Sequence, residues 1–548
     1  MRSSRWWLAS IWVCFLLRGW FYASVFPLWE GYDEFAHFGV IRAVALKGMW
    51  LVPRDQPGPR DVEESFKCVP IPWEVRGWNV FRASLTEEAY WALPPEERRA
   101  RQAHLREIPA SWQLQDSTGG ISAYEALQPP LYYWLMAPVL AAMKGSGLLA
   151  QVMVLRWIGI GLASLAVPLT FAIASKVVRR EPVALGCAAV VAVMPGFATN
   201  AARISNEPLS ILIFTLLIWA GLRALERAPD TGSGAALGTI LGLGLLTKAY
   251  FLTAVPAVIL LMVYRYRKAW LAAVTASAIS IAIAGWWYAR NMVTTGTLSG
   301  LAEPVMLRGR GLATQLHAIF HVPWLRAVDV ILVSHLYFSG WSSLTVRSWM
   351  YHVFFAIALL AALGLIAQLR RVSVVWLLAV YGFFWIGQLY NVVLQYLTKG
   401  LAGSMGWYMY AVVACEAVLC AVAFGRWRLQ AVALGTILFG ALDLYAAHWI
   451  VIPYYTGIIG HRANGALAAF HVSQLRSVGF VNVFARLAAN KPGLISPPAL
   501  MILWVLYLAA TILPMAAVSV QSVRRARSAA HIPASPENRN ATIRTRTR

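Results

Sequence analysis

The chain has 548 residues, of which 59% are hydrophobic and 13% are charged, and its mean hydropathy of +0.59 excludes an ordinary soluble protein. The formal net charge of +23 would suit a nucleic-acid-binding protein. The basic residues, however, cluster at alternate ends of apolar segments, which is the pattern that sets membrane topology. We therefore expect membrane lipids, and no nucleic acid, among the partners of this chain.

Apolar segments long enough to cross a bilayer recur along the chain. They predict an all-α polytopic membrane protein with about twelve transmembrane helices, at residues 6–26, 149–178, 183–200, 208–225, 235–247, 250–264, 269–288, 351–369, 373–390, 407–424, 429–450 and 497–518. The fifth and sixth segments are short for a span. No small-residue cleavage site follows the first segment, so we interpret it as a retained helix and not as a signal peptide.

The basic clusters lie on the same side of the membrane in this arrangement, and they place both termini in the cytoplasm. We predict one transmembrane domain over residues 1–521, with a large extracytoplasmic loop at residues 27–147. Residues 522–548 are rich in Arg, Ser and Pro and are expected to form a disordered basic cytoplasmic tail.

The first extracytoplasmic loop opens with an acidic pair, although the whole chain has only 24 Asp and Glu residues. Asp33 and Glu34 are adjacent, and His37 follows one helical turn later. Phe35 and Phe38 belong to an apolar stripe, which predicts a short helix lying on the membrane surface. A carboxylate placed there is a candidate general base for a lipid-borne substrate. The alternative is that Asp33 only caps the helix, which is a common role of aspartate.

Other charged residues are predicted at the same membrane face: Arg203, Glu207, Lys248, Arg290 and Lys399. Acidic clusters ringed by basic side chains suit a phosphate-bearing substrate whose sugar undergoes acid/base chemistry. The alternative is that part of this set consists of solvated loop charges. The cysteine and histidine spacings indicate no metal site.

Several segments occur in the order found in one known superfamily. DEFAHFGVIRAVALKGMWLVPR resembles the first outer loop of GT-C superfamily glycosyltransferases, and QPPLYYWL resembles the segment that follows in protein mannosyltransferase-like and aminoarabinose transferase-like members. RISNEPLSILIF resembles their second acidic motif. LGLGLLTKAYFL and WWYARNMVTTGTLSG resemble later helix ends, while HLYFSGWSSL and GSMGWYMYAVV extend the likeness toward an uncharacterised bacterial branch.

This resemblance implies a GT-C-like helical bundle with extracytoplasmic juxtamembrane helices. It also implies inverting transfer of a sugar from a polyprenyl-phosphate-linked donor to an envelope acceptor, which is a lipid, a glycan or a protein. By position in the motifs, Asp33 is the catalytic base, with support from Glu34, His37 and Glu207. The donor phosphate is assigned to Arg203, Lys248, Arg290 and Lys399.

Two departures from the family pattern stand out. Glu207 occupies a position where aspartate is more usual, which leaves a role for a divalent metal open. Trp407 occupies a position where a Gly-Arg-Tyr pattern is usual. Either Lys399 substitutes for the missing cation, or the donor differs from that of the family.

The main alternative function is a flippase or transporter of a lipid-linked sugar, and it is motivated by three ionisable residues within spans, Arg18, Glu416 and Asp443. A non-catalytic scaffold is a second alternative. A transporter predicts internal repeats, whereas this chain has no convincing repeat and gathers its charges at one face, so we favour the enzyme.

Overall fold

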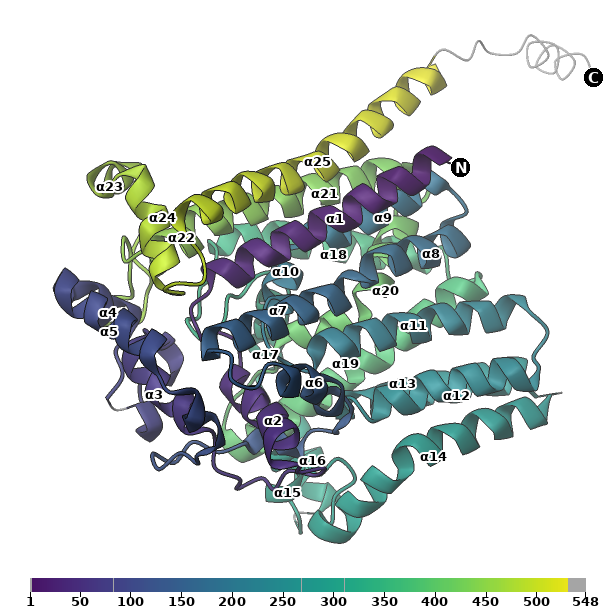
Figure 1. The fold of residues 1–548 in the computed structure, drawn as a ribbon. Coiled ribbons are helices and arrows are strands. Elements are labelled where there is room, and N and C mark those ends of the chain that lie inside the picture. The colour runs from purple at the N-terminus through teal and green to yellow at the C-terminus, as the bar shows by residue number, and fades with distance from the viewer. Residues whose placement is uncertain (1, 82, 268, 310, 531–548) are drawn as a thin grey trace, which may run out of the picture.

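The computed structural model describes residues 2–81, 83–267, 269–309 and 311–530, and within them helices are the main regular structure, with only isolated bridge pairs besides. This confirms the predicted all-α class (Figure 1). Long helices run side by side through the molecule, which is the arrangement expected where lipid offers no partner for backbone polar groups.

The helices that coincide with the predicted spans are α1 (Arg2–Val25), α7 (Leu148–Ser164), α8 (Ala166–Val178), α9 (Glu181–Val193), α10 (Pro195–Ala201), α11 (Glu207–Glu226), α12 (Thr231–Leu245), α13 (Ala254–Arg265), α14 (Trp270–Thr295), α18 (Ser348–Ile366), α19 (Val372–Lys399), α20 (Val413–Ala423), α21 (Arg428–Ala446) and α25 (Pro497–Ala530). In the described residues, nine helices are long and apolar enough to cross a membrane, or up to eleven if each of two bent pairs is one span. The predicted number of about twelve is higher because it includes α12 and α13, which are short apolar helices.

Helix α12 lies close against α14. A Cβ atom added to Gly234 or Gly238 would come within 2.2 and 2.3 Å of the carbonyl oxygens of Ala272 and Ala276, respectively. Small residues at four-residue spacing allow two membrane helices to approach to backbone contact. This packing fixes α12 in the bundle despite its length.

The ionisable residues within spans are paired. Arg18 lies 2.9 Å from the carboxylate of Asp443, and both side chains are fully buried. Arg18 also donates to the carbonyl of Val193 at 2.9 Å, where α9 and α10 meet at an angle of 58°. His335 pairs with Glu416 at 2.8 Å. These contacts give the buried charges structural partners, as charges at membrane depth require.

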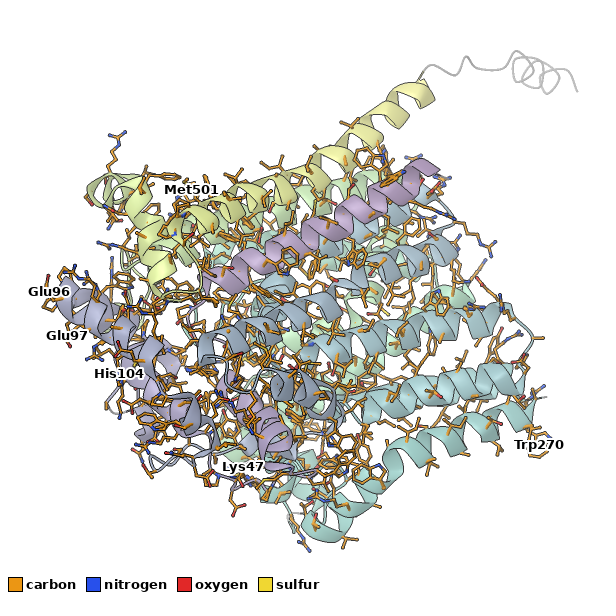
Figure 2. The ribbon with its side chains drawn as sticks, in the orientation of Figure 1. Lys47, Glu96, Glu97, His104, Trp270 and Met501 are labelled. Atoms are coloured by element: carbon orange, nitrogen blue, oxygen red, sulfur yellow. The ribbon has the colours of Figure 1, made fainter. Side chains whose placement is uncertain are left out.

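The short helices gather at one end of the bundle, while the start of α1 lies at the opposite end (Figure 1). They are α2 (Glu34–Lys47), α3 (Arg60–Cys68), α4 (Glu87–Ala92), α5 (Pro95–Glu107), α6 (Leu131–Ala142), α15 (Ala302–Met306), α16 (Leu312–Ile319), α17 (Trp324–Leu336), α22 (Ile452–Tyr455), α23 (Val472–Val478) and α24 (Phe480–Ala489). In Figure 2, Glu96, Glu97 and His104 mark this end, and Trp270 marks the other.

Helix α2 is enclosed by protein, so the expectation of a helix lying on the membrane surface is wrong. All ten residues from Glu34 to Ala43 are buried. Arg42 explains the enclosure, because it binds Asp61 of the same loop at 2.6 Å and Gln151 of α7 at 2.7 Å. The first loop therefore folds over α2 and holds it against the bundle.

Candidate active site

Asp33 occupies the N-cap position of α2, but its side chain does not cap the helix. The backbone has a left-handed conformation, with φ 54° and ψ 17°, which is uncommon for a residue other than glycine. The carboxylate accepts a hydrogen bond of 2.6 Å from the hydroxyl of Tyr124, a residue of the short helix η4 (Tyr124–Leu127). The capping alternative therefore does not describe this carboxylate, which is free to face a cavity.

Glu34, the next residue, points the other way and is fully engaged. Arg156 of α7 donates to its two carboxylate oxygens at 2.8 and 2.7 Å, and the backbone N–H of Ile204 donates at 3.0 Å. Both charged side chains are completely buried. The pair ties the first loop to the bundle, and Glu34 is not among the residues that line the cavity beside Asp33.

That cavity, about 50 Å³ in volume, is lined by Tyr32, Asp33, His37, Glu125, Gln128, Asn200, Arg203, Ser205, Glu207, Lys248, Trp407 and Tyr408. It brings together five of the catalytic and phosphate-binding residues predicted from the sequence, although they come from positions as distant as 33 and 248. Glu34, Arg290 and Lys399 are not in its lining.

The two cations of the cavity have different surroundings. Lys248 contacts the carboxylate of Glu207 and donates to Asn206 at 2.9 Å. The side chain of Arg203 is buried, and neither its Nε nor its Nη2 has a hydrogen-bond partner among the described residues. A buried guanidinium with free donors is costly unless something binds it. Arg203 is therefore the cation available to an anionic ligand.

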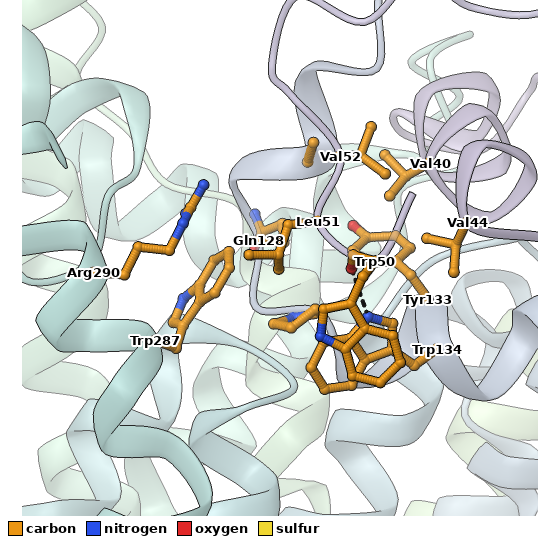
Figure 3. Close-up of a pocket in the computed structure, with 12 residues that line it drawn as sticks. Val40, Val44, Trp50, Leu51, Val52, Gln128, Tyr133, Trp134, Trp287 and Arg290 are labelled. Atoms are coloured by element: carbon orange, nitrogen blue, oxygen red, sulfur yellow. Dashed lines mark hydrogen bonds between the residues drawn. The ribbon is translucent and has the colours of Figure 1, made fainter. Parts of the chain in front are cut away.

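Arg290 lies beside a neighbouring cavity, which Figure 3 shows together with Trp50, Trp134 and Trp287. The rings of Trp50 and Trp134 stack with centroids 4.1 Å apart, and the guanidinium of Arg290 lies 5.1 Å from the centre of the Trp287 ring. Gln128 lines both cavities, so Arg290 is close to the Asp33 cavity without being part of its wall.

Lys399 is half exposed and pairs with Glu303 at 2.9 Å. Trp407 stands where the family pattern has an arginine. Its ring stacks on Tyr32 with ring centroids 3.8 Å apart and planes 14° apart. Tyr32 is anchored through a 2.8 Å hydrogen bond from its hydroxyl to the carbonyl of Gly340. An aromatic wall therefore occupies this side of the cavity.

Glu125 is the acidic residue of the cavity that sequence reasoning missed. It lies in η4, three residues before the Gln-Pro-Pro-Leu segment. Its Oε2 atom is 3.6 Å from Nε2 of His37, and the other imidazole nitrogen of His37 is 3.0 Å from the hydroxyl of Tyr133. The segment EALQPPLYYWL contained this signal, but only the folded loop brings Glu125 next to α2.

Burial changes the proton affinities of these groups. It raises the pKa of Asp33, against the opposing effects of the Tyr124 hydrogen bond and the Lys248 charge. Burial and the neighbouring charge of Asp33 raise the pKa of Glu125 to about 8. Burial, followed by the charge of Lys248, lowers the pKa of His37 well below its ordinary value, so that His37 is neutral.

A group of three or more His, Cys, Asp or Glu side chains arranged to hold a metal ion is not found in the described part of the chain. Glu207 instead has Lys248 and the hydroxyl of Tyr250, at 3.0 Å, as its partners.

Residues 143–297 match the family model for dolichyl-phosphate-mannose-protein mannosyltransferase. This segment contains Arg203, Glu207, Lys248 and Arg290. Asp33 lies before its first residue and is outside the match. No curated protein matches the chain.

Among solved structures, the chain is similar to ArnT from Cupriavidus metallidurans bound to undecaprenyl phosphate, with 14% identity, a TM-score of 0.42 and coverage of 95% of this chain and 78% of that chain. It is also similar to the archaeal oligosaccharyltransferase AglB from Archaeoglobus fulgidus in complex with an inhibitory peptide and a dolichol-phosphate, with 14% identity, a TM-score of 0.33 and coverage of 88% and 56%, respectively.

The chain is a multi-pass membrane protein by the length and composition of its helices. The family match over its central segment confirms the resemblance to GT-C membrane glycosyltransferases that the sequence motifs indicate.

Proposed function

We propose that this protein transfers a sugar from a polyprenyl-phosphate-linked donor to an envelope acceptor, which is a lipid, a glycan or a protein, at the outer face of a bacterial inner membrane. One observation carries the proposal. Asp33 and Arg203 line the same cavity, and the Nε and Nη2 atoms of Arg203 have no hydrogen-bond partner among the described residues. A base and a free cation in one enclosed site suit an acceptor hydroxyl and a departing phosphate.

In the proposed reaction, Asp33 takes the proton of the acceptor hydroxyl. The acceptor oxygen forms a bond to the anomeric carbon of the sugar, and the bond between that carbon and the phosphate oxygen breaks. The electron pair of the broken bond leaves with the polyprenyl phosphate, whose negative charge is stabilised by Arg203. Attack from the face opposite the phosphate inverts the anomeric configuration.

The Arg203 guanidinium is preorganised for this role. Its Cζ atom lies 4.9 Å from the centre of the Tyr32 ring, and a Cβ atom on Gly31 would come within 2.9 Å of its Cβ. The side chain is therefore held by close packing from one side, while its donors stay free. Lys248 also contributes positive potential, but its ammonium group is already paired with the carboxylate of Glu207.

The transporter alternative receives less support. It is motivated by Arg18, Glu416 and Asp443, and each of these has a partner inside the bundle. Charges that are occupied in this way act as structural pairs and do not form an open polar pathway.

A transfer assay tests the proposal. The full chain, reconstituted in nanodiscs, is given radiolabelled undecaprenyl-phosphate mannose, glucose or aminoarabinose, with an envelope extract of the source cells as acceptor. We expect label to move to the acceptor with at least one donor, and Asp33→Asn to reduce this transfer by about two orders of magnitude or more. A folded Asp33→Asn variant as active as the wild type would rule out the mechanism.

A further inference from the structure

The cavity around Asp33 contains more acidic than basic side chains. Three carboxylates, from Asp33, Glu125 and Glu207, line it together with the cations of Arg203 and Lys248. Lys248 and Glu207 form a pair and cancel each other. If Asp33 and Glu125 were both ionised as well, three carboxylates would face the two cations of the cavity. A donor phosphate would then meet an excess negative charge in a buried site, which disfavours its binding.

The contacts of His37 indicate that Glu125 carries a proton. Tyr133 donates its hydroxyl hydrogen to the main-chain carbonyl of Glu125 at 3.1 Å, so the same hydroxyl oxygen accepts from Nδ1 of His37 at 3.0 Å. A neutral imidazole protonated at Nδ1 has a lone pair at Nε2. That lone pair faces Oε2 of Glu125 at 3.6 Å. The arrangement is favourable when Glu125 is a carboxylic acid and repulsive when it is a carboxylate.

Asp33 has the opposite surroundings. Its carboxylate accepts the 2.6 Å hydrogen bond from Tyr124, and a hydrogen bond of this kind favours the ionised form. When two neighbouring carboxyl groups have environments that differ in this way, one is ionised and the other keeps its proton. Here the charge belongs on Asp33 and the proton on Glu125.

The remaining groups around Glu125 do not change this assignment. The titratable or charged side chains around it belong to η4, to α2 and the residue before it, to α6 and α11, and to the segments around residues 248 and 408. They are Asp33, His37, Tyr124, Tyr133, Glu207, Lys248 and Tyr408. Lys248 is the cation in this set, and it is bound to Glu207. A side-chain hydrogen bond from Gln128 and the charge of Lys248 favour the ionised form of Glu125, but burial and the charge of Asp33 outweigh these two effects.

We propose that Glu125 is a positioning residue that keeps its proton while the donor binds. Asp33 is then the ionised carboxylate that faces the phosphate held by Arg203, because the other ionised carboxylate of the cavity, Glu207, is paired with Lys248. This inference rests on the proposed function, because it concerns the affinity for the donor. Ionisation of Asp33 then governs turnover, and protonation of Glu125 governs donor binding. Since the pKa of Glu125 is raised to about 8, donor affinity is high below this pH and falls as the pH rises through it.

Binding of a lipid phosphodiester at two pH values tests the inference. Undecaprenyl methyl phosphate is a suitable probe, because its single negative charge does not change in this range. With the full chain in nanodiscs, we expect the wild-type Kd to rise at least about tenfold between about pH 7 and about pH 9.5 as Glu125 ionises. Glu125→Gln imitates the protonated acid and should bind at both pH values with a Kd within about twofold of wild type at neutral pH.

Turnover gives the second readout. With an active sugar donor, the KM of the wild type should rise in alkaline solution, and this rise should disappear in Glu125→Gln. The matched control is Glu96→Gln, because Glu96 is an exposed residue of α5 that pairs with Arg99. This variant should keep the pH dependence of the wild type.

Three results would overturn the inference: a wild-type Kd that does not change with pH, a Glu125→Gln variant that loses affinity as the wild type does, or a folded Glu125→Gln variant that does not bind the diester at neutral pH. The first needs no variant, so the inference stays testable if Glu125→Gln does not fold. Wild-type protein that binds the diester with the expected pH dependence but transfers no sugar would remove the proposed function alone.

Discussion

Arg156 holds Glu34 with two nitrogen atoms, at 2.8 and 2.7 Å, in a pair that has no exposed surface. The side chains come from α7 and from the first turn of α2, so the contact orients the helix that begins directly after Asp33. The same arginine donates to the carbonyls of Phe26 and Pro27 at 3.0 and 2.7 Å. One guanidinium therefore fixes both the end of α1 and the start of the loop that carries Asp33.

Replacement of Glu34 should affect folding before it affects chemistry. Glu34→Ala leaves the charge of Arg156 buried without its partner, and the expected loss is about 3–5 kcal/mol in the free energy of unfolding. Thermal unfolding of the detergent-solubilised variant measures this loss. Asp33→Asn is the matched control and should keep its melting temperature within a few degrees of wild type. A Glu34→Ala protein with normal stability but no transfer would instead give Glu34 a direct catalytic role.

Tyr124→Phe tests the hydrogen bond to Asp33. The bond favours the ionised carboxylate, so its loss should raise the pKa of Asp33 further above its ordinary value. The base acts when it is ionised, so kcat decreases when the pH is lowered through the pKa of Asp33. In the variant this decrease should occur at a higher pH than in the wild type. The measurement is kcat against pH from about 5 to 8. An unchanged acid limb in a folded variant would mean that Tyr124 does not control Asp33, or that Asp33 is not the base.

Arg203 and Arg290 should differ in donor binding. Arg203 lines the Asp33 cavity and has two nitrogen atoms without a hydrogen-bond partner in the described part of the chain, whereas Arg290 is exposed beside a different cavity. We expect Arg203→Ala to raise the KM for the donor at least about tenfold, consistent with the loss of a charge-assisted contact. Arg203→Lys should recover only part of the loss, because lysine lacks the planar fork. Arg290→Ala is the matched control, and an equal or larger effect there would move the phosphate site toward the neighbouring cavity.

Membrane orientation can be tested with introduced cysteines. Cys68 is unsuitable as a natural label because it is buried. Ala100 is exposed on α5, and Ala228 is exposed in the turn between α11 and α12, next to Arg227. In bacterial spheroplasts, a membrane-impermeant thiol reagent should modify Ala100→Cys and spare Ala228→Cys, since the basic turn is predicted in the cytoplasm. The reverse labelling would place the Asp33 cavity on the cytoplasmic side.

The positions of the helices could be predicted from hydrophobic length, and the acidic pair could be predicted because charges are rare in such a chain. The separate roles of Asp33 and Glu34 could not, since they depend on a left-handed backbone at residue 33 and on Arg156, which lies more than a hundred residues away. Glu125 was missed for a related reason. Its position in the loop resembles that of any polar residue, and only the packing of η4 against α2 brings it to His37.

The pairing of basic residues was also beyond the sequence pattern. Lys248 and Lys399 look alike as outer-face cations, yet Glu207 holds the first inside the cavity and Glu303 holds the second outside it. The hydropathy pattern predicts on which side of the membrane a residue lies. It does not predict which carboxylate a lysine binds, because this depends on distances between different loops.

Residue 33 is a position where laboratory evolution for robustness and for activity should diverge. A non-glycine residue with a φ of 54° carries a steric cost of about 1 kcal/mol that glycine does not have. A mutant library screened only for heat resistance should therefore be enriched in Asp33→Gly. The variants selected in this way should be stable but should lack transfer activity. A library screened for product should retain aspartate there and collect its stabilising changes elsewhere in the bundle.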